Sequence, residues 1–118
     1  MVEKTYQVQT AARTEAALSS AVLAVDERLR RAPDSAELWM ERGLALADQR
    51  LMREAVEAFS KAISLDPFQG IFYRHRAHRY LSCWRFQDAC ADFTLASRLI
   101  PGNWDVWYHL GRSHYLLG

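Results

Sequence analysis

The chain has 118 residues, half of them hydrophobic, and a formal net charge of +1. This length suffices for one domain with a buried core, and the near balance of charge argues against bulk attraction to nucleic acid or to an anionic membrane. The first residues show no basic segment followed by an apolar run, and no stretch approaches the length of a membrane span, so we expect no signal peptide, no membrane association and a cytoplasmic location. The two cysteines fit a reducing compartment.

Residues 5–31 are rich in alanine and almost free of helix breakers, which predicts one helix, or two if Ser19 and Ser20 interrupt it. Its apolar stripe consists of Ala17, Leu18, Ala21, Val22, Val25 and Leu29. Pro33 stands 34 residues before Pro67, so the end of this segment is in phase with a later part of the chain. We interpret residues 1–33 as an N-terminal helical cap or a degenerate repeat.

A period of 34 residues relates the following blocks to one another. The recurring residues are Trp39, Gly43, Ala55, Phe59 and Pro67, then Tyr73, Ala77, Ala89, Phe93 and Pro101, then Trp107 and Gly111. Within each block, apolar residues recur at helical spacing, and small residues stand where two helix axes would approach closely. Each block is therefore predicted to be two amphipathic helices joined by a short turn. A fixed period of this length is typical of a stacked repeat.

Capping residues mark where two of these helices should begin. Asp34 and Ser35 offer side-chain acceptors to a helix that should run to about Gln49, and Asn103 can cap a last helix over residues 104–117.

The spacing of these aromatic, glycine, alanine and proline residues resembles the tetratricopeptide repeat (TPR) family. The resemblance implies an all-α, right-handed superhelical stack of antiparallel helix pairs, with units at residues 34–69 and 70–103 and the first helix of an incomplete unit at residues 104–118. Arg42 and Arg76 occupy slots where the family usually has leucine. Arg50 and Trp84 occupy the usual turn glycine, and because a left-handed backbone is strained for other residues, we expect both turns to be altered.

No motif for catalysis or for a cofactor is present, so we expect neither an enzyme nor a bound cofactor. The side chains that could be imagined as metal ligands are His75, His78, His109, His114, Cys83 and Cys90. Because the sequence indicates no clustered third and fourth ligands for a closed site, we expect no metal. We interpret the histidines as polar residues of the surface or groove, and both cysteines as small buried hydrophobes.

The resemblance also implies a function, that of a non-catalytic scaffold which binds a peptide or a partner helix in a concave groove. The groove-facing residues it implies are Glu37, Met40, Leu44, Asp48, Ile71, Arg74, His78, Leu81, Asp105, Tyr108, Arg112 and Tyr115. Arginine and tyrosine in this lining suit a protein partner with an acidic group flanked by apolar residues. The alternative is that Arg74 and Arg112 pair with carboxylates of the chain itself. A clamp for a C-terminal carboxylate is not expected, since its lysine and asparagine slots hold Met40 and Leu44.

Two other functions stay open. The last helix lacks its hairpin partner, so residues 104–118 could mediate self-association, or the chain could be a fragment of a longer array. The basic and aromatic stretch at residues 72–86 could bind single-stranded nucleic acid by stacking, but a helix spreads its arginines around the circumference, so we regard this as the less favoured alternative.

Overall fold

The computed structural model describes residues 18–118. The earlier part of the expected N-terminal helix, residues 5–17, lies outside the described residues. The described helices are α2 (Ser20–Arg31), α3 (Ala36–Asp48), α4 (Met52–Leu65), α5 (Gly70–Ser82), α6 (Phe86–Leu99) and α7 (Trp104–Leu117). Between residues 18 and 118 no strand occurs, which confirms the all-α prediction. None of these helices is long and apolar enough to cross a membrane.

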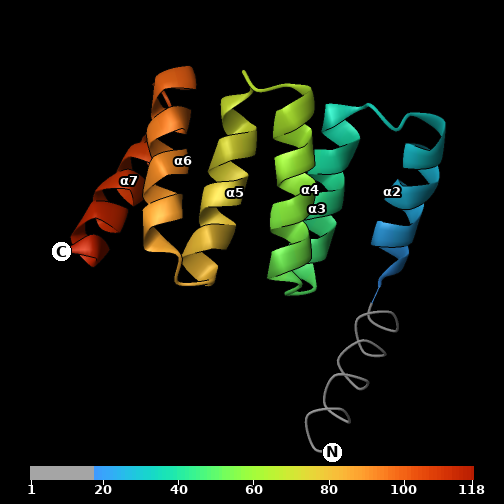
Figure 1. Cartoon of the computed structure of the whole chain (residues 1–118), viewed down its shortest axis with the longest axis horizontal. Helices are drawn as coiled ribbons and strands as arrows, with labels where there is room; N and C mark the ends of the chain where they lie inside the picture. The colour runs from blue at the N-terminus through green and yellow to red at the C-terminus, as the bar shows by residue number, and fades with distance from the viewer. Residues whose placement is uncertain (1–17) are drawn as a thin grey trace, which may run out of the picture.

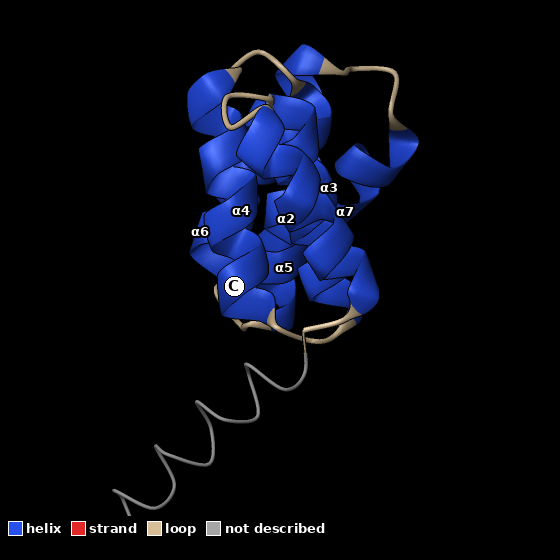
Figure 2. Ribbon diagram, turned by 90° about the vertical axis from the view of Figure 1, so that its right-hand side faces the viewer, coloured by secondary structure: helices blue, strands red, loops and turns tan. Residues whose placement is uncertain are grey.

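The helices stand side by side in chain order, each antiparallel to the one before it (Figure 1). The closest pairs are α3 with α4 and α5 with α6, while α2 packs on α3, α4 on α5 and α7 on α6. Figure 2 shows α4 and α6 on one side of the stack and α3 and α7 on the other. α3, α5 and α7 are the first helices of successive hairpins, and α4 and α6 are the second helices.

Three of the helix starts are fixed by side-chain caps. The Ser19 hydroxyl accepts a hydrogen bond from the Val22 N–H at 3.3 Å, and α2 begins at the next residue. Ser35 caps α3 and Asn103 caps α7 in the same way, as predicted. These caps fix the residue at which each of the three helices begins.

The core follows the alternation of small and large residues. Phe59 and Phe93 are fully buried, and the alanines beside them at positions 55, 62, 77, 89 and 96 have no exposed surface. Gly43 lies so close to Phe59 that a Cβ atom there would meet the ring Cε1 at 2.5 Å. The small residues thus allow the helix axes to approach, as the repeat pattern predicted.

A second repeated contact closes the loops between hairpins. The indole N–H of Trp39 donates to the Pro33 carbonyl at 2.8 Å, and that of Trp107 donates to the Pro101 carbonyl at the same distance. In the middle unit the hydroxyl of Tyr73 donates to the Pro67 carbonyl at 2.9 Å. The recurring aromatic residue therefore anchors the proline loop that precedes its helix, in addition to packing beside it.

The expectation that the turns at Arg50 and Trp84 are altered is wrong. Both residues adopt the left-handed conformation, with φ of 65° and 62°. The Arg50 N–H bonds the Ala47 carbonyl and the next N–H bonds the Leu46 carbonyl, and the turn at Trp84 repeats both bonds. This pair of bonds satisfies the last carbonyls of the helix. The satisfied carbonyls and the packing of the hairpin offset a strain of about 1 kcal/mol per residue.

The two arginines in leucine slots are each paired with an aspartate. The guanidinium of Arg42 donates to Asp26 of α2 at 2.6 Å. That of Arg76 donates to both oxygens of Asp92 on α6, at 2.7 and 2.9 Å, and to the Ser60 hydroxyl of α4 at 3.0 Å. The apolar contact of the usual leucine is thus replaced by an ion pair between helices.

Candidate peptide-binding surface

The twelve predicted groove residues all lie on α3, α5 and α7, the first helices of the hairpins. Those that are exposed are Glu37, Leu44, Asp48, Tyr108, Arg112 and Tyr115. Those that are half-buried are Met40, Ile71, Arg74, His78, Leu81 and Asp105. Every position therefore reaches solvent, and two subsets of them come together with residues outside the predicted set.

The first subset is a polar cluster that joins α5 to α7. The guanidinium of Arg74 donates to Oδ2 of Asp105 at 2.7 Å, and Nε2 of His78 lies 3.2 Å from the same oxygen. On α7 itself, Nε2 of His109 lies 3.2 Å from Oδ1 of Asp105. Arg74 thus pairs with a carboxylate of the chain, which was the alternative to its binding a partner.

The charges of this cluster are fixed by its burial and its hydrogen bonds. Burial lowers the pKa of His78, and the bond to Asp105 opposes this without overcoming it. The imidazole is therefore neutral at pH 7. Burial alone would raise the pKa of Asp105, but the hydrogen bonds from Arg74 and His78 outweigh it and hold that pKa below its usual value. The ionised carboxylate of Asp105 therefore faces the guanidinium of Arg74.

The same cluster contains a partial set of metal ligands. Donor atoms of His78, Asp105 and His109 all lie within 4.8 Å of one another. The sequence missed Asp105 as the third donor, although its place four residues before His109 puts both on one face of a helix. Two imidazoles and a carboxylate are a ligand set that zinc accepts. The guanidinium of Arg74 already bonds this carboxylate and its charge opposes a cation, so the geometry favours a hydrogen-bonded network.

The other suggested ligands lie apart from this cluster. Sγ of Cys90 lies 3.4 Å from Nε2 of His114, on α6 and α7. Cys90 is buried as expected, but Cys83 is exposed, so the expectation of two buried cysteines is wrong for Cys83. Cys83 is the residue before the left-handed Trp84, at the end of a helix, where a side chain points to solvent.

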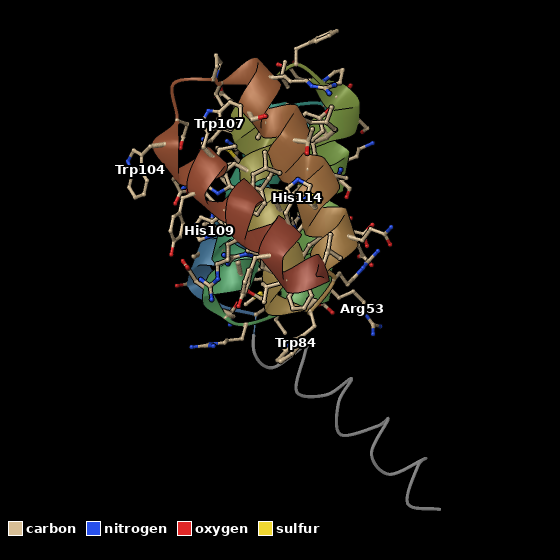
Figure 3. All side chains as sticks on the ribbon, turned by 90° about the vertical axis from the view of Figure 1, so that its left-hand side faces the viewer. Arg53, Trp84, Trp104, Trp107, His109 and His114 are labelled. Carbon is tan, nitrogen blue, oxygen red and sulfur yellow. The ribbon has the colours of Figure 1, made fainter. Side chains whose placement is uncertain are left out.

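The second subset lines a cavity of about 390 Å³ at the end of the stack where the α5–α6 turn meets the C-terminal end of α7. Its lining residues are Leu81, Ser82, Trp84, Phe86, Arg112 and Leu116. Leu81 and Arg112 were predicted, whereas the other four were missed. Trp84 beneath the end of α7 is visible in Figure 3. The sequence signals for the missed residues were a tryptophan in a turn-glycine slot and a leucine one helical turn after Arg112.

The four predicted residues of α3 belong to neither subset. Met40 packs against the buried cluster around Phe59. Asp48 faces Arg79 of α5, where burial lowers the pKa of the guanidinium and the negative charge of Asp48 partly offsets that effect. At this end of the surface the predicted residues therefore form no joint cluster or cavity.

The arginines of the basic stretch are mostly neutralised. Arg74, Arg76 and Arg85 bond aspartates on α7, α6 and α6 respectively. Within residues 72–86 the structure therefore shows no continuous row of unpaired guanidinium groups that could follow a phosphate backbone.

Comparisons with known proteins can be set beside this geometry. A sequence profile of the tetratricopeptide repeat family matches residues 11–70. Human and mouse tetratricopeptide repeat protein 33 are each 27% identical to the chain over 78 residues, which make up 66% of this chain and 30% of theirs. The chain therefore spans less than a third of the length of these relatives.

Solved structures show the same fold. The crystal structure of MamA matches with a TM-score of 0.80 at 24% identity, over 90% of this chain and 62% of that chain. The first TPR of Spaghetti (RPAP3), solved bound to the HSP90 peptide SRMEEVD, matches with a TM-score of 0.80 at 16% identity, over 98% of this chain and 88% of that chain. These likenesses confirm the expected right-handed superhelical stack of antiparallel helix pairs.

Proposed function

The chain belongs to the tetratricopeptide repeat family, and from that premise we propose that it is a non-catalytic scaffold which binds a peptide segment or helix of a partner protein along α3, α5 and α7. The supporting observation is that all twelve predicted positions reach solvent on the first helices of successive hairpins. A stack of packed hairpins holds these helices rigid, so binding loses little conformational entropy.

The proposed repeat units are residues 34–69, 70–103 and 104–118, preceded by a cap or degenerate repeat at residues 1–33. Support comes from the helix pairs α3–α4 and α5–α6, which lie within the two full units, and from α7, which lies within the third. The family match begins at residue 11, which supports a degenerate repeat before the first full unit.

A preference for acidic partners rests on Arg112. Arg74 already bonds Asp105, whereas among residues 18–118 no carboxylate pairs with the exposed Arg112. A related fold, the first TPR of Spaghetti, was solved with a peptide that contains acidic residues. We therefore propose Arg112, with Tyr108 and Tyr115 on the same helix, as the group that selects a carboxylate.

Selection of peptides from a random display library tests this function. Peptides that bind the full chain should lose affinity about tenfold or more when Leu44 on α3 is changed to Glu, because the change puts a charge into the proposed contact. Leu95→Glu is the matched control, since Leu44 and Leu95 have exposed fractions of 36% and 40% but Leu95 lies on α6. Equal losses in both variants, or losses at Leu95 alone, would contradict the proposal.

The second candidate function is self-association through residues 104–118. The observation in its favour is that α7 exposes several large apolar side chains, including Trp104 at 76%, Trp107 at 51% and Leu117 at 48%. Exposed apolar patches of this kind often mark protein interfaces. Light scattering of the chain across micromolar concentrations, which measures its molar mass, tests for self-association. A mass that rises with concentration, and returns to the monomer in a Trp104→Ala, Leu117→Ser variant, would favour self-association, and a constant monomer mass would exclude it.

A further inference from the structure

The cavity at the C-terminal end of the stack combines apolar walls with a cation that pairs with no carboxylate of residues 18–118. Leu81, Trp84, Phe86 and Leu116 supply the walls, and Arg112 is the charged lining residue. The Trp84 and Phe86 rings lie 5.8 Å apart in a tilted arrangement, so they form one aromatic wall. A volume of about 390 Å³ lies at the small end of ligand pockets, which suits one bulky side chain with a short polar neighbour.

Comparison with the first hairpin shows what is special about Trp84. Arg50 occupies the equivalent turn with nearly the same left-handed φ, so the backbone conformation belongs to the turn and not to the cavity. The difference is the side chain: Trp84 holds an indole that is 80% exposed over the cavity. The indole N–H groups of Trp39 and Trp107 bond proline carbonyls, whereas within residues 18–118 no such bond involves Trp84. An exposed indole beside a pocket offers a stacking face and a free donor.

We propose that this cavity is a specificity subsite for an internal peptide segment in which a bulky apolar side chain stands next to an Asp or Glu. The apolar side chain enters between Trp84, Phe86 and Leu116, and the carboxylate receives the guanidinium of Arg112. The lining of the cavity supports this choice of peptide. Its apolar walls match the apolar side chain, and Arg112, which no described carboxylate neutralises, matches the Asp or Glu. The subsite rests on the proposed peptide-binding function and names the residues that a partner must present.

The test uses capped pentapeptides and the full chain. The probe is acetyl-Gly-Glu-Phe-Glu-Gly-amide, titrated while the indole cross-peak of Trp84 and the backbone amides of Leu81 and Leu116 are followed by NMR. We expect shifts at these three residues. Replacing both Glu by Gln should weaken binding about fivefold, as should Arg112→Gln, because an exposed charge pair contributes modestly. Replacing Phe by Ala should weaken binding about tenfold or more.

Two matched variants separate the indole from the turn. Trp84→Gly removes the side chain and relieves the left-handed strain, so the protein stays folded while backbone amides report the binding. Arg50→Gly makes the same backbone change in the first hairpin and should bind the probe as the wild type does. The proposal is overturned if Trp84→Gly binds the probe with unchanged affinity, or if the probe produces no shift up to millimolar concentration.

A third outcome separates this proposal from the function it rests on. Shifts confined to Met40, Leu44 and the rest of α3 would overturn the subsite while supporting peptide binding by the scaffold. Conversely, equal losses in the Leu44 and Leu95 variants, with probe binding at Trp84 intact, would contradict binding along α3, α5 and α7 and would still support the subsite.

A peptide that ends in a free carboxylate, acetyl-Gly-Ala-Phe, should bind more weakly than the internal Glu probe. Tighter binding of that peptide would also overturn the proposal.

Discussion

His75 is a half-buried histidine held between an aromatic ring and positive charges. Its imidazole stacks on the Phe59 ring with centroids 5.6 Å apart. Burial, followed by the charges of Arg74, His78 and Arg79, lowers its pKa from 6.5 to about 4. The sequence placed this residue among surface or groove histidines, whereas its contact with Phe59 ties it to the core.

This pKa makes the stability of the fold depend on pH. Between pH 4 and 6.5 the unfolded chain binds more protons at His75 than the folded chain does, so the free energy of unfolding should fall as the pH falls through this window. Above pH 6.5 the residue contributes no further change, since both states are neutral. The lowered pKa of His78 acts in the same direction.

Urea unfolding of the wild type and of His75→Gln, measured at several values of pH, checks this prediction. The difference between the two free energies of unfolding should be constant above pH 6.5 and should shift in favour of the variant toward pH 4. A pH-independent difference would show that His75 titrates alike in both states.

At the scale of the helix, equivalent small slots differ in what surrounds them. A Cβ at Gly43 would lie 2.5 to 2.8 Å from three atoms of the buried Phe59 ring. A Cβ at Gly111 of α7 would meet no heavy atom within 4 Å. The two glycines occupy equivalent positions of the repeat. Only Gly43 lies against a second helix, because Phe59 of α4 packs on it.

Alanine at the two positions should therefore change stability in opposite directions. Gly43→Ala should lower the free energy of unfolding by about 1–2 kcal/mol, since overpacking of about 1–3 kcal/mol exceeds the gain in helix propensity. Gly111→Ala should raise it by up to about 1 kcal/mol, because it gains propensity without a clash. Equilibrium urea denaturation measures both, and the same sign for both variants would refute the distinction.

Between helices, the pair of Arg76 and Asp92 replaces an apolar contact. Asp92 is 3% exposed and accepts two hydrogen bonds from the guanidinium. Burial alone would lower the pKa of Arg76, but the bond and charge of Asp92 raise it. The guanidinium of Arg76 therefore neutralises the buried carboxylate of Asp92 inside the hairpin.

Removal of one partner should be far more harmful than removal of both. Asp92→Ala should destabilise the protein by about 3 kcal/mol or more, because it leaves the guanidinium buried without an anion. The double variant Arg76→Leu, Asp92→Leu should lie within about 1 kcal/mol of the wild type, since it restores an apolar contact. Thermal unfolding compares the two. If the double variant were as unstable as Asp92→Ala, the contacts of Arg76 with Ser60 and the neighbouring rings would be the source of stability.

For the whole molecule, Phe59 links three helices into one core. It lies on α4, contacts the Gly43 position on α3 and stacks on His75 of α5. In a stack of repeats each unit is stabilised by its neighbours, so a defect at such a junction weakens both hairpins.

Phe59→Ala should destabilise the fold by about 3–5 kcal/mol through the cavity it leaves. Amide hydrogen exchange should speed up in α7 as well as in α3, because the loss of one interface loosens the rest of the stack. Phe68→Ala is the matched control, since that ring is 79% exposed in the following loop and its loss should change little. Faster exchange in α3 with unchanged protection in α7 would mean that the hairpins unfold independently.

The sequence by itself determined the helix pairs, the caps of α3 and α7, the period and the small and large residues of the core. Each of these depends on residues close in the chain or on a repeated spacing, and such patterns can be read from a single sequence. The twelve groove residues that the family resemblance implies lie on α3, α5 and α7, and their role in binding stays a prediction.

The tertiary structure alone decided which of those residues meet. Asp105 binds Arg74 from 31 positions away, and the cavity joins a turn after α5 to the end of α7. The left-handed turns at Arg50 and Trp84 persist because hydrogen bonds and hairpin packing offset local strain. Contacts between distant side chains depend on the distance and rotation between packed helices, and periodicity does not specify either with the accuracy of a hydrogen bond.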